Sequence, residues 1–303
     1  MSGHAPRVLV TGGSGFIGRH VVAELQTRGH HVVNVDRQPH PDGVETVLGE
    51  LNDPRVVARA VTTDLDAIVH LAAETSVLGS IQRPALVHET NVTTTANLLE
   101  AAREKSVGRF LLASSNSVVG EHEGTMTEDV PLRPLTPYGA TKAAGEMLMS
   151  GYAGAFGLVT PVLRLTNVYG PGMLAKDSFV PRMMRAAADG EGVTVYGDGL
   201  QRRDLVHVSD VARAFALAVE GWPSGPVIIG SSTSYTVLDM VEAARAVTGA
   251  PIPVEHVAPK AGEMRAVVVD TSLARSRGFE PTCSLEAGMA TVWPDFRPVD
   301  VAV

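Results

Sequence analysis

The sequence predicts an α/β fold, with a doubly wound parallel sheet and a smaller, interleaved C-terminal lobe. In the first half, short apolar runs alternate with longer helical patterns, which is the rhythm of βαβ units. Most of these runs are rich in β-branched residues, as strands buried on both faces require. After about residue 165 the alternation loosens, and prolines divide the chain into short elements. These prolines are Pro171, Pro181, Pro223, Pro226, Pro251, Pro253, Pro259 and Pro281.

Local patterns place the elements in order. The expected strands are residues 8–11, 31–36, 67–71, 110–114 and 159–165. Ile17, Val21 and Leu25 form the apolar stripe of a helix that ends at Gly29. Further helical patterns occur at residues 55–61, 92–103 and 211–219. Because the last of these should pack on the sheet, we expect interleaved domains: residues 1–165 with about 196–220, and residues 166–195 with 221–303.

Composition and charge exclude several classes of protein. With 45% hydrophobic and 19% charged residues, the chain is neither disordered nor fibrous. The net charge of −8 gives no support for a nucleic-acid partner. No signal pattern, membrane-spanning run or metal-ligand spacing is present, so neither a membrane nor a metal is expected. The single Cys283 cannot form an internal disulfide, which favours a reducing, cytoplasmic location.

A glycine-rich loop follows the first expected strand and opens the first expected helix. Gly12, Gly15 and Gly18 permit a tight turn, a close approach of the backbone to a pyrophosphate, and tight packing of the helix on the strand. The helix N-terminus supplies free N–H groups and partial positive charge for the phosphates. An ordinary glycine turn is the alternative. The position between a strand and a periodic helix favours a dinucleotide-binding, Rossmann-type domain.

The second expected strand ends at Asp36, where a carboxylate can accept hydrogen bonds from both ribose hydroxyls of an adenosine. Because that carboxylate would repel a 2′-phosphate, it favours NAD over NADP. Arg37 follows directly and can attract the extra phosphate, so NADP remains the alternative. Glu50 and Leu51 end the next strand, where an acidic group can meet the adenine. A solvated loop carboxylate is the other interpretation of Glu50.

Tyr138 and Lys142 lie one turn apart on the same face of an expected helix. A phenol titrates near about pH 10 in water, and a nearby ammonium lowers its pKa by stabilising the phenolate. This pair therefore predicts a catalytic base, with a solvated lysine beside a packed tyrosine as the alternative. Ser115 follows the strand 110–114 at the ligand-binding edge of the sheet. Its hydroxyl can hydrogen-bond the same substrate oxygen and relay the proton.

An ordered series of motifs covers nearly the whole chain. They are TGGSGFIG at 11–18, HLAAE at 70–74, TNV at 90–92, SSNSVVG at 114–120, PYGATK at 137–142, RLTNVYGPG at 164–172, VYGDGLQRRDLVHVSDVA at 195–212 and GFEPTCSLEAGM at 278–289. In this series the chain resembles an extended short-chain dehydrogenase/reductase of the NAD-dependent sugar-nucleotide epimerase/dehydratase family. The resemblance implies that Tyr138 is the catalytic base, that Lys142 orients the nicotinamide ribose, and that Ser115 is the hydroxyl partner.

The resemblance also implies which residues bind the ligands. For the cofactor, NAD, they are Gly12, Gly15, Phe16, Ile17, Gly18, Asp36, Arg37, Glu50, Leu51, Leu71, Ala72, Ala73, Tyr138 and Lys142. For a nucleotide-diphosphate sugar, they are Thr75, Ser115, Asn116, Ser117, Asn167, Phe179, Val180, Tyr196, Arg203 and Lys260. Within this second set Asn167 and Arg203 contact the diphosphate, although Arg203 has a surface ion pair with Asp204 as its alternative. Lys260 replaces an arginine, which keeps the charge but loses the bidentate fork.

Departures from the family's motifs favour one reaction. Dehydrating members carry an acidic pair directly after the catalytic hydroxyl, where this chain has Asn116 and Ser117. Neither side chain can act as the acid and base that elimination of water requires. Decarboxylating members carry a glutamate at the position of Ser117. We therefore expect an NAD-dependent nucleotide-sugar 4-epimerase, with an NAD(P)H-dependent 4-ketoreductase and a non-catalytic NAD sensor as alternatives. The resemblance further implies a homodimer formed through the helices around 92–103 and 138–155.

Overall fold

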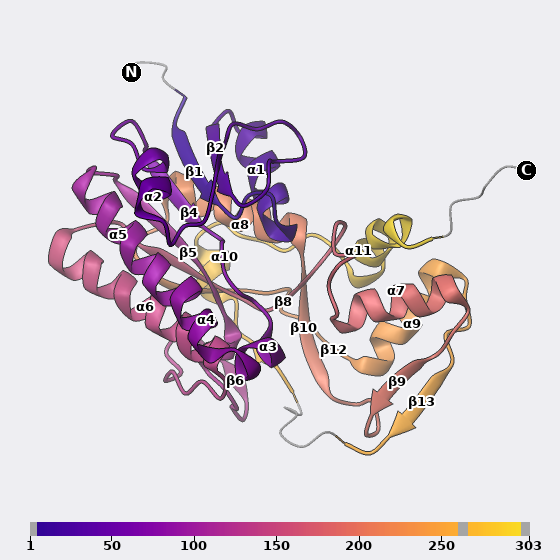
Figure 1. The fold of residues 1–303 in the computed structure, drawn as a ribbon. Coiled ribbons are helices and arrows are strands. Elements are labelled where there is room, and N and C mark those ends of the chain that lie inside the picture. Colours follow the sequence, from indigo (N-terminus) through magenta and orange to yellow (C-terminus); the bar gives the residue numbers. More distant parts are fainter. Residues whose placement is uncertain (1–4, 260–265, 298–303) are drawn as a thin grey trace, which may run out of the picture.

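The computed structural model describes residues 5–259 and 266–297, which form two lobes (Figure 1). The larger lobe is built on a seven-stranded sheet with strand order β11-β7-β5-β4-β1-β2-β3. All its strands are parallel, which confirms the predicted fold class. Their bounds are β1 Arg7–Thr11, β2 His31–Asp36, β3 Thr46–Leu48, β4 Ala67–His70, β5 Arg109–Ser115, β7 Pro161–Leu165 and β11 Gly225–Ile229.

Helices cover both faces of this sheet. One face carries α1 (Phe16–Thr27), α8 (Val208–Gly221) and α10 (Ser272–Ser276), and the other carries α2 (Pro54–Ala60), α5 (Thr94–Glu104) and α6 (Pro137–Phe156). Since successive strand side chains point to opposite faces, Val8 and Val10 pack with α1 and α8, while Leu9 packs with α5. Of the predicted apolar stripe, Val21 and Leu25 are fully buried, whereas Ile17 is only partly buried.

Two parts of the expected domain division are wrong. Strand β11 was expected in the second lobe, but it pairs in parallel with β7 at the edge of the large sheet. Strand β10 (Arg202–His207) was expected in the first domain, but it lies between β8 (Asn167–Tyr169) and β12 (Ser234–Thr236) in a separate three-stranded sheet. Both placements depend on pairing with strands far away in the chain. Helix α8 packs on the large sheet as expected, beside α1.

The smaller lobe packs three helices around a methionine-rich core. These are α7 (Phe179–Asp189), α9 (Val237–Thr248) and α11 (Leu285–Val292), with β9 (Val193–Tyr196) and β13 (Val254–Val257) at one edge (Figure 1). The remaining elements are short: α3 Val77–Gln82, α4 Pro84–His88, a π-helical turn Glu89–Thr93, β6 Thr125–Met126, β14 Val268–Val269 and the 3-10 turns Asn116–Val118 and Trp293–Asp295. Among the described residues, no helix combines the length and apolarity needed to cross a membrane.

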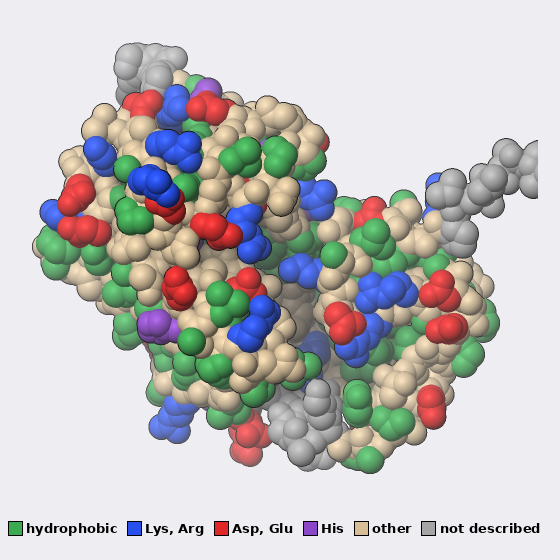
Figure 2. Space-filling model, in the orientation of Figure 1, with side chains coloured by type: hydrophobic (Ala, Val, Ile, Leu, Met, Phe, Trp, Pro, Cys, Tyr) green, Lys and Arg blue, Asp and Glu red, His purple; other side chains and the backbone are tan. Residues whose placement is uncertain are grey.

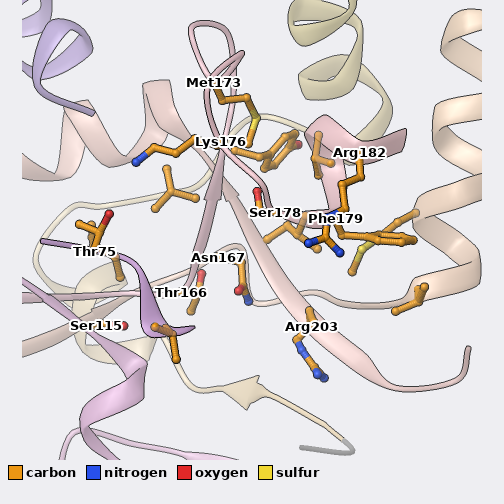
Figure 3. Close-up of a pocket in the computed structure, with 18 of the residues that line it drawn as sticks. Thr75, Ser115, Thr166, Asn167, Met173, Lys176, Ser178, Phe179, Arg182 and Arg203 are labelled. Atoms are coloured by element: carbon orange, nitrogen blue, oxygen red, sulfur yellow. The ribbon is translucent and has the colours of Figure 1, made fainter. Parts of the chain in front are cut away.

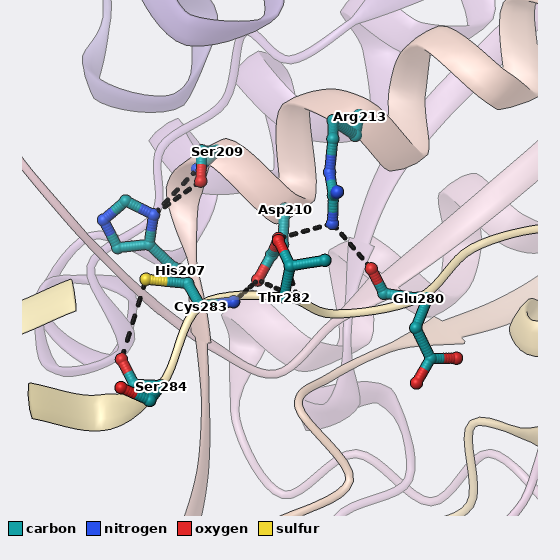
Figure 4. Close-up of polar contacts among 8 residues, drawn as sticks. All are labelled: His207, Ser209, Asp210, Arg213, Glu280, Thr282, Cys283 and Ser284. Atoms are coloured by element: carbon teal, nitrogen blue, oxygen red, sulfur yellow. Dashed lines mark hydrogen bonds and ion pairs between the residues drawn. The ribbon is translucent and has the colours of Figure 1, made fainter. Parts of the chain in front are cut away.

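A buried carboxylate fastens the segment that leads into α11 to the large lobe. Asp210, in the first turn of α8, accepts a hydrogen bond from Arg213 Nη2 at 2.6 Å (Figure 4). It also accepts the backbone N–H groups of Thr282 and Cys283, each at 3.2 Å. The side chain of Asp210 is almost fully buried. The Thr282 hydroxyl donates to it as well, at 3.1 Å, so four donors compensate its charge and fix the position of the smaller lobe's last helix.

A second buried ion pair, between Glu146 on α6 and Arg164 on β7, supports the end of the sheet. The Arg164 Nη2 lies 2.8 Å from Glu146 Oε2, and both side chains are about 5% exposed or less. Ser114 donates to the same carboxylate at 2.5 Å. The pair therefore holds α6 against the carboxyl ends of β5 and β7.

Replacing Arg164 by leucine should lower the free energy of unfolding by about 3–5 kcal/mol, because Glu146 would remain buried without its counter-charge. Urea denaturation monitored by circular dichroism measures this loss. The matched control is Arg55→Leu, at the solvent-exposed pair with Asp53, and it should have little effect. Equal losses in the two variants would contradict the role assigned to burial.

Candidate active site

A cavity of about 570 Å³ lies between the two lobes, beyond the carboxyl ends of the central strands. In the space-filling view, the surface is hollowed between the lobes, and Lys and Arg side chains lie along the hollow (Figure 2). Phe16 and Ile17, from the first turn of α1, line the cavity together with Ser115 and Tyr138. The start of α1 therefore faces the same space as Ser115 and Tyr138, whereas the third predicted catalytic residue, Lys142, is not among the residues that line it.

The glycine loop has room for backbone only. Gly12 has φ +73°, and a Cβ added there would lie 2.8 Å from the backbone N of Ala72. A Cβ at Gly18 would lie 2.1 Å from the carbonyl oxygen of Gly12. The Gly15 N–H also donates to Gly12 O at 3.1 Å, which closes the turn. This tight loop at a helix N-terminus fits the pyrophosphate of a dinucleotide.

Asp36 lies beside the glycine loop at the end of β2. Its carboxylate accepts the backbone N–H of Ser14 at 3.1 Å and that of Gln38 at 3.2 Å. The half-buried side chain is therefore held in a fixed position beside the glycine loop. Arg37 is exposed beside it.

The other predicted adenine contacts differ from one another in burial. Glu50 is exposed, whereas Leu51 is buried in the core between the sheet and α2. Because the Leu51 side chain packs with Val35 and Val56, only its backbone can face a ligand.

The segment after β4, which holds the predicted residues Leu71, Ala72 and Ala73, is fixed by a buried histidine. Burial lowers the pKa of His70 to about 3, so its ring is neutral. The Thr95 hydroxyl donates to the carbonyl oxygen of Asn91, so it accepts a hydrogen bond from His70 Nε2 at 3.0 Å. The other ring nitrogen, Nδ1, therefore carries no proton and accepts from the Thr11 hydroxyl at 2.7 Å. The Ala72 N–H in turn donates to Thr11 Oγ1 at 3.2 Å.

Two further residues, Asn91 and Ser80, hold Tyr138 in place. The Asn91 side chain bonds the backbone N and O of Glu74 at 2.8 and 3.0 Å and donates to Thr141 Oγ1 at 3.0 Å. Thr141 donates to the carbonyl of Tyr138 at 2.8 Å, and Ser80 Oγ accepts the Tyr138 N–H at 3.1 Å. Sequence reasoning missed both roles, although Asn91 lies in the TNV motif that carried the resemblance.

The predicted catalytic pair is buried at the start of α6, which contradicts the alternative of a solvated lysine. Tyr138 is 9% and Lys142 is 6% exposed. Lys142 Nζ donates to the carbonyl oxygen of Ala113 at 2.8 Å, and burial lowers its pKa to about 8. Helix α6 is capped by Thr136, whose hydroxyl accepts the Gly139 N–H at 3.2 Å.

The expected lowering of the Tyr138 pKa by Lys142 is wrong for the protein chain alone. Burial desolvates the phenolate and raises the pKa of Tyr138. The hydrogen bond with Ser115 acts in the opposite direction and is the smaller effect. The phenol therefore needs positive charge from outside the chain, in addition to Lys142, to release its proton at neutral pH.

Most of the predicted substrate residues line the cavity. They are Thr75, Ser115, Asn167, Phe179, Val180, Tyr196 and Arg203. Asn116 and Ser117 do not, because they turn away in the 3-10 turn after β5, where the Ser117 N–H donates to Ser115 Oγ at 3.2 Å. Lys260 lies outside the described residues.

The ion pair considered for Arg203 and Asp204 does not form. The Asp204 carboxylate is fully buried and accepts from Thr166 Oγ1 at 2.7 Å and from the Ser231 N–H at 2.9 Å. Arg203 instead lines the cavity, where Asn167 lies close to it (Figure 3). In the described part of the chain, no group of three or more His, Cys, Asp or Glu side chains is placed to hold a metal ion.

Comparisons with known proteins agree with this geometry. The model of the NAD dependent epimerase/dehydratase family matches residues 8–230. A dTDP-glucose 4,6-dehydratase of Streptomyces niveus is 36% identical, over 93% of this chain and 90% of that protein. The crystal structure of a UDP-glucose 4-epimerase of Thermotoga maritima with UDP-glucose has a TM-score of 0.90 and 31% identity, over 96% of this chain and 98% of that one.

The structure of MoeE5 in complex with UDP-glucuronic acid and NAD has a TM-score of 0.88 and 37% identity, over 95% of this chain and 98% of that one. The relatives thus include a dehydratase and an epimerase at similar identity, and the similarity extends over nearly the whole length. The chain belongs to the NAD-dependent epimerase/dehydratase family.

Proposed function

We propose that the protein is an NAD-dependent nucleotide-sugar 4-epimerase. One observation carries the proposal: among the described residues that line the cavity there is no Asp or Glu. Ser115 is followed by the neutral Asn116 and Ser117. Elimination of water needs an acid and a base besides the tyrosine, whereas inversion at C4 needs only one group that takes and returns a proton.

We propose that the larger lobe binds the cofactor and the smaller lobe binds most of the substrate. Gly12, Gly15 and Gly18 leave the space for the pyrophosphate, and Asp36 accepts the ribose hydroxyls. Bound NAD supplies reversible acceptance of a hydride from C4 of the sugar. In this proposal Lys142, one turn after Tyr138, holds the nicotinamide ribose.

Tyr138 and Ser115 perform the proton transfer in this proposal. Tyr138 takes the proton of the C4 hydroxyl while the C4 hydrogen leaves, and Ser115 hydrogen-bonds the same oxygen. The 4-keto sugar then turns over, anchored by its nucleotide; the hydride returns to C4 on the opposite face of the ring, and Tyr138 returns the proton to the C4 oxygen. Arg203 and Asn167 hold the diphosphate, and Phe179, Val180 and Tyr196 pack around the nucleobase.

Incubation with UDP- and dTDP-hexoses without added cofactor tests the proposed activity. We expect C4 epimers with no net oxidation, identified by NMR of the products. A 4-ketoreductase would instead consume NAD(P)H in proportion to a supplied 4-keto sugar. Formation of a 4-keto-6-deoxy sugar would show a dehydratase and contradict the proposal.

We also propose that two copies pair through α5 and α6. These helices pack on each other, with Tyr152 Oη donating to Glu100 at 3.1 Å. Met147 and Phe156 on α6 nevertheless remain 59% and 56% exposed. Apolar side chains of this size at the outer face of a helix pair are typical of a subunit interface.

Met147→Glu should convert the dimer into a monomer, because it would place two carboxylates in an apolar interface. Light scattering coupled to size exclusion measures the mass. Leu200→Glu is the control, since Leu200 is also 59% exposed but lies in the smaller lobe, and it should leave the dimer intact. A monomeric unmodified protein, or a dimeric Met147→Glu variant, would contradict the proposed interface.

A further inference from the structure

We infer that the preferred nucleotide sugar carries a carboxylate on its hexose, and that Lys176 binds this carboxylate. The inference rests on the proposed function and concerns the sugar end of the same cavity. It names a class of substrate, the nucleotide-linked uronic acids, and a residue that selects it.

The first observation is the charge of the cavity. Lys176, Arg182 and Arg203 line it, and no acidic side chain does so among the described residues. This concentration of cations occurs in a protein whose net charge is −8. A cavity of this kind favours an anionic ligand.

The second observation is that the cations are divided between two ends of the cavity. Arg182 and Arg203 lie on the side of Phe179, where we place the diphosphate and nucleobase (Figure 3). The ammonium of Lys176 points away from both arginines, towards the side where Thr75 and Ser115 lie. Because Ser115 is the hydrogen-bond partner of Tyr138, this is the end where the sugar ring reacts.

The third observation is that Lys176 is anchored by its backbone alone. Its N–H donates to Met173 O at 2.9 Å, and Arg185 Nη2 donates to its carbonyl oxygen at 3.0 Å. Arg182 already pairs with Asp177 at 2.7 Å, whereas no carboxylate in residues 5–259 or 266–297 pairs with Lys176. Lys176 therefore has a fixed backbone and an ammonium that pairs with no described carboxylate, which suits a charge-assisted hydrogen bond with a ligand.

The residues after the catalytic hydroxyl agree with this assignment. Asn116 and Ser117 are neutral, so the polypeptide next to Ser115 would not repel a sugar carboxylate. Both residues lie in the 3-10 turn after β5 and do not line the cavity, so this turn adds no negative charge at the sugar end.

The test compares a uronic acid with its neutral counterpart on the same nucleotide. For the wild type and Lys176→Met, we would measure kcat/KM with UDP-glucuronic acid and UDP-glucose, and repeat both with the dTDP-linked sugars. The wild type should prefer the uronic acid, and Lys176→Met should reduce this preference by about 10–100-fold, as expected for a lost hydrogen bond to a charged group. Lys105→Met, an exposed lysine just after α5, should keep the wild-type preference.

Binding of the same four sugars, measured by calorimetry, gives a readout independent of turnover. An equal loss of affinity for both sugars would mean that Lys176 contacts a phosphate of the substrate or cofactor, and this would overturn the inference. An unchanged preference in Lys176→Met, or a wild type that favours the neutral sugar, would also overturn it. If the protein epimerises UDP-glucose but does not prefer the uronic acid, the inference about Lys176 is overturned and the proposed function stands. If it binds the uronic acid preferentially but epimerises neither sugar, the result counts against the proposed function alone.

Discussion

Tyr138→Phe should reduce turnover by about 10²–10⁴-fold while leaving NAD binding intact. The substitution removes one oxygen and keeps the ring, which is 9% exposed and packed at the start of α6. Without the phenol, the neighbouring Ser115 hydroxyl remains in the cavity, but a serine is too weakly acidic to replace the tyrosine. Initial rates with the preferred nucleotide sugar measure the loss, and calorimetry measures the affinity for NAD.

Tyr152→Phe is the matched control for this experiment. Tyr152 lies on the same helix and also loses a hydrogen bond when its hydroxyl is removed, namely the bond to Glu100. Its hydroxyl faces α5 rather than the cavity, so the rate should stay within a few-fold of the wild type. A near-normal rate for Tyr138→Phe would refute its role as the base, and equal losses in both variants would indicate a general effect on α6.

Gly18→Ala should abolish tight NAD binding. The added methyl group would lie 2.1 Å from Gly12 O and 2.6 Å from Gly13 Cα, and both are backbone atoms that no side-chain rotation can move. The turn must therefore open, which displaces the N–H groups that we assign to the pyrophosphate and costs about 1–3 kcal/mol of stability. The NAD content of the purified protein and calorimetric titration measure the effect.

Gly221→Ala provides the control for this prediction. A Cβ at Gly221, the exposed last residue of α8, would meet nothing within 4 Å, so NAD binding should be unchanged. Normal NAD affinity in Gly18→Ala would contradict the assignment of the loop to the cofactor.

The sequence predicted the parts of the fold that local patterns specify. Strand β2 ends at Asp36 as expected, and the glycine loop lies between β1 and α1 because its spacing is a short-range signal. Strands β10 and β11 were placed wrongly, because their partners β8, β12 and β7 are set by long-range pairing. No local pattern reports which of two sheets a short apolar run will join.

For the candidate site, the motifs predicted Tyr138, Lys142 and Ser115, and the structure brings Tyr138 and Ser115 into one cavity. The direction of the Tyr138 pKa shift was not predictable, since it depends on burial that spacing does not report. The position of Lys176, for which we propose a role in substrate binding, was not predictable for a related reason: it lies in the loop after Pro171, which has no periodic pattern to orient it.

In the proposed function, Tyr138 supports a reversible, redox-neutral exchange at C4 of a nucleotide sugar. A substrate with deuterium at C4, incubated without added cofactor and analysed by NMR, tests this role. We expect an epimer that retains deuterium at C4. Deuterium found at another carbon, lost to solvent, or released into a stoichiometrically reduced cofactor would contradict this role.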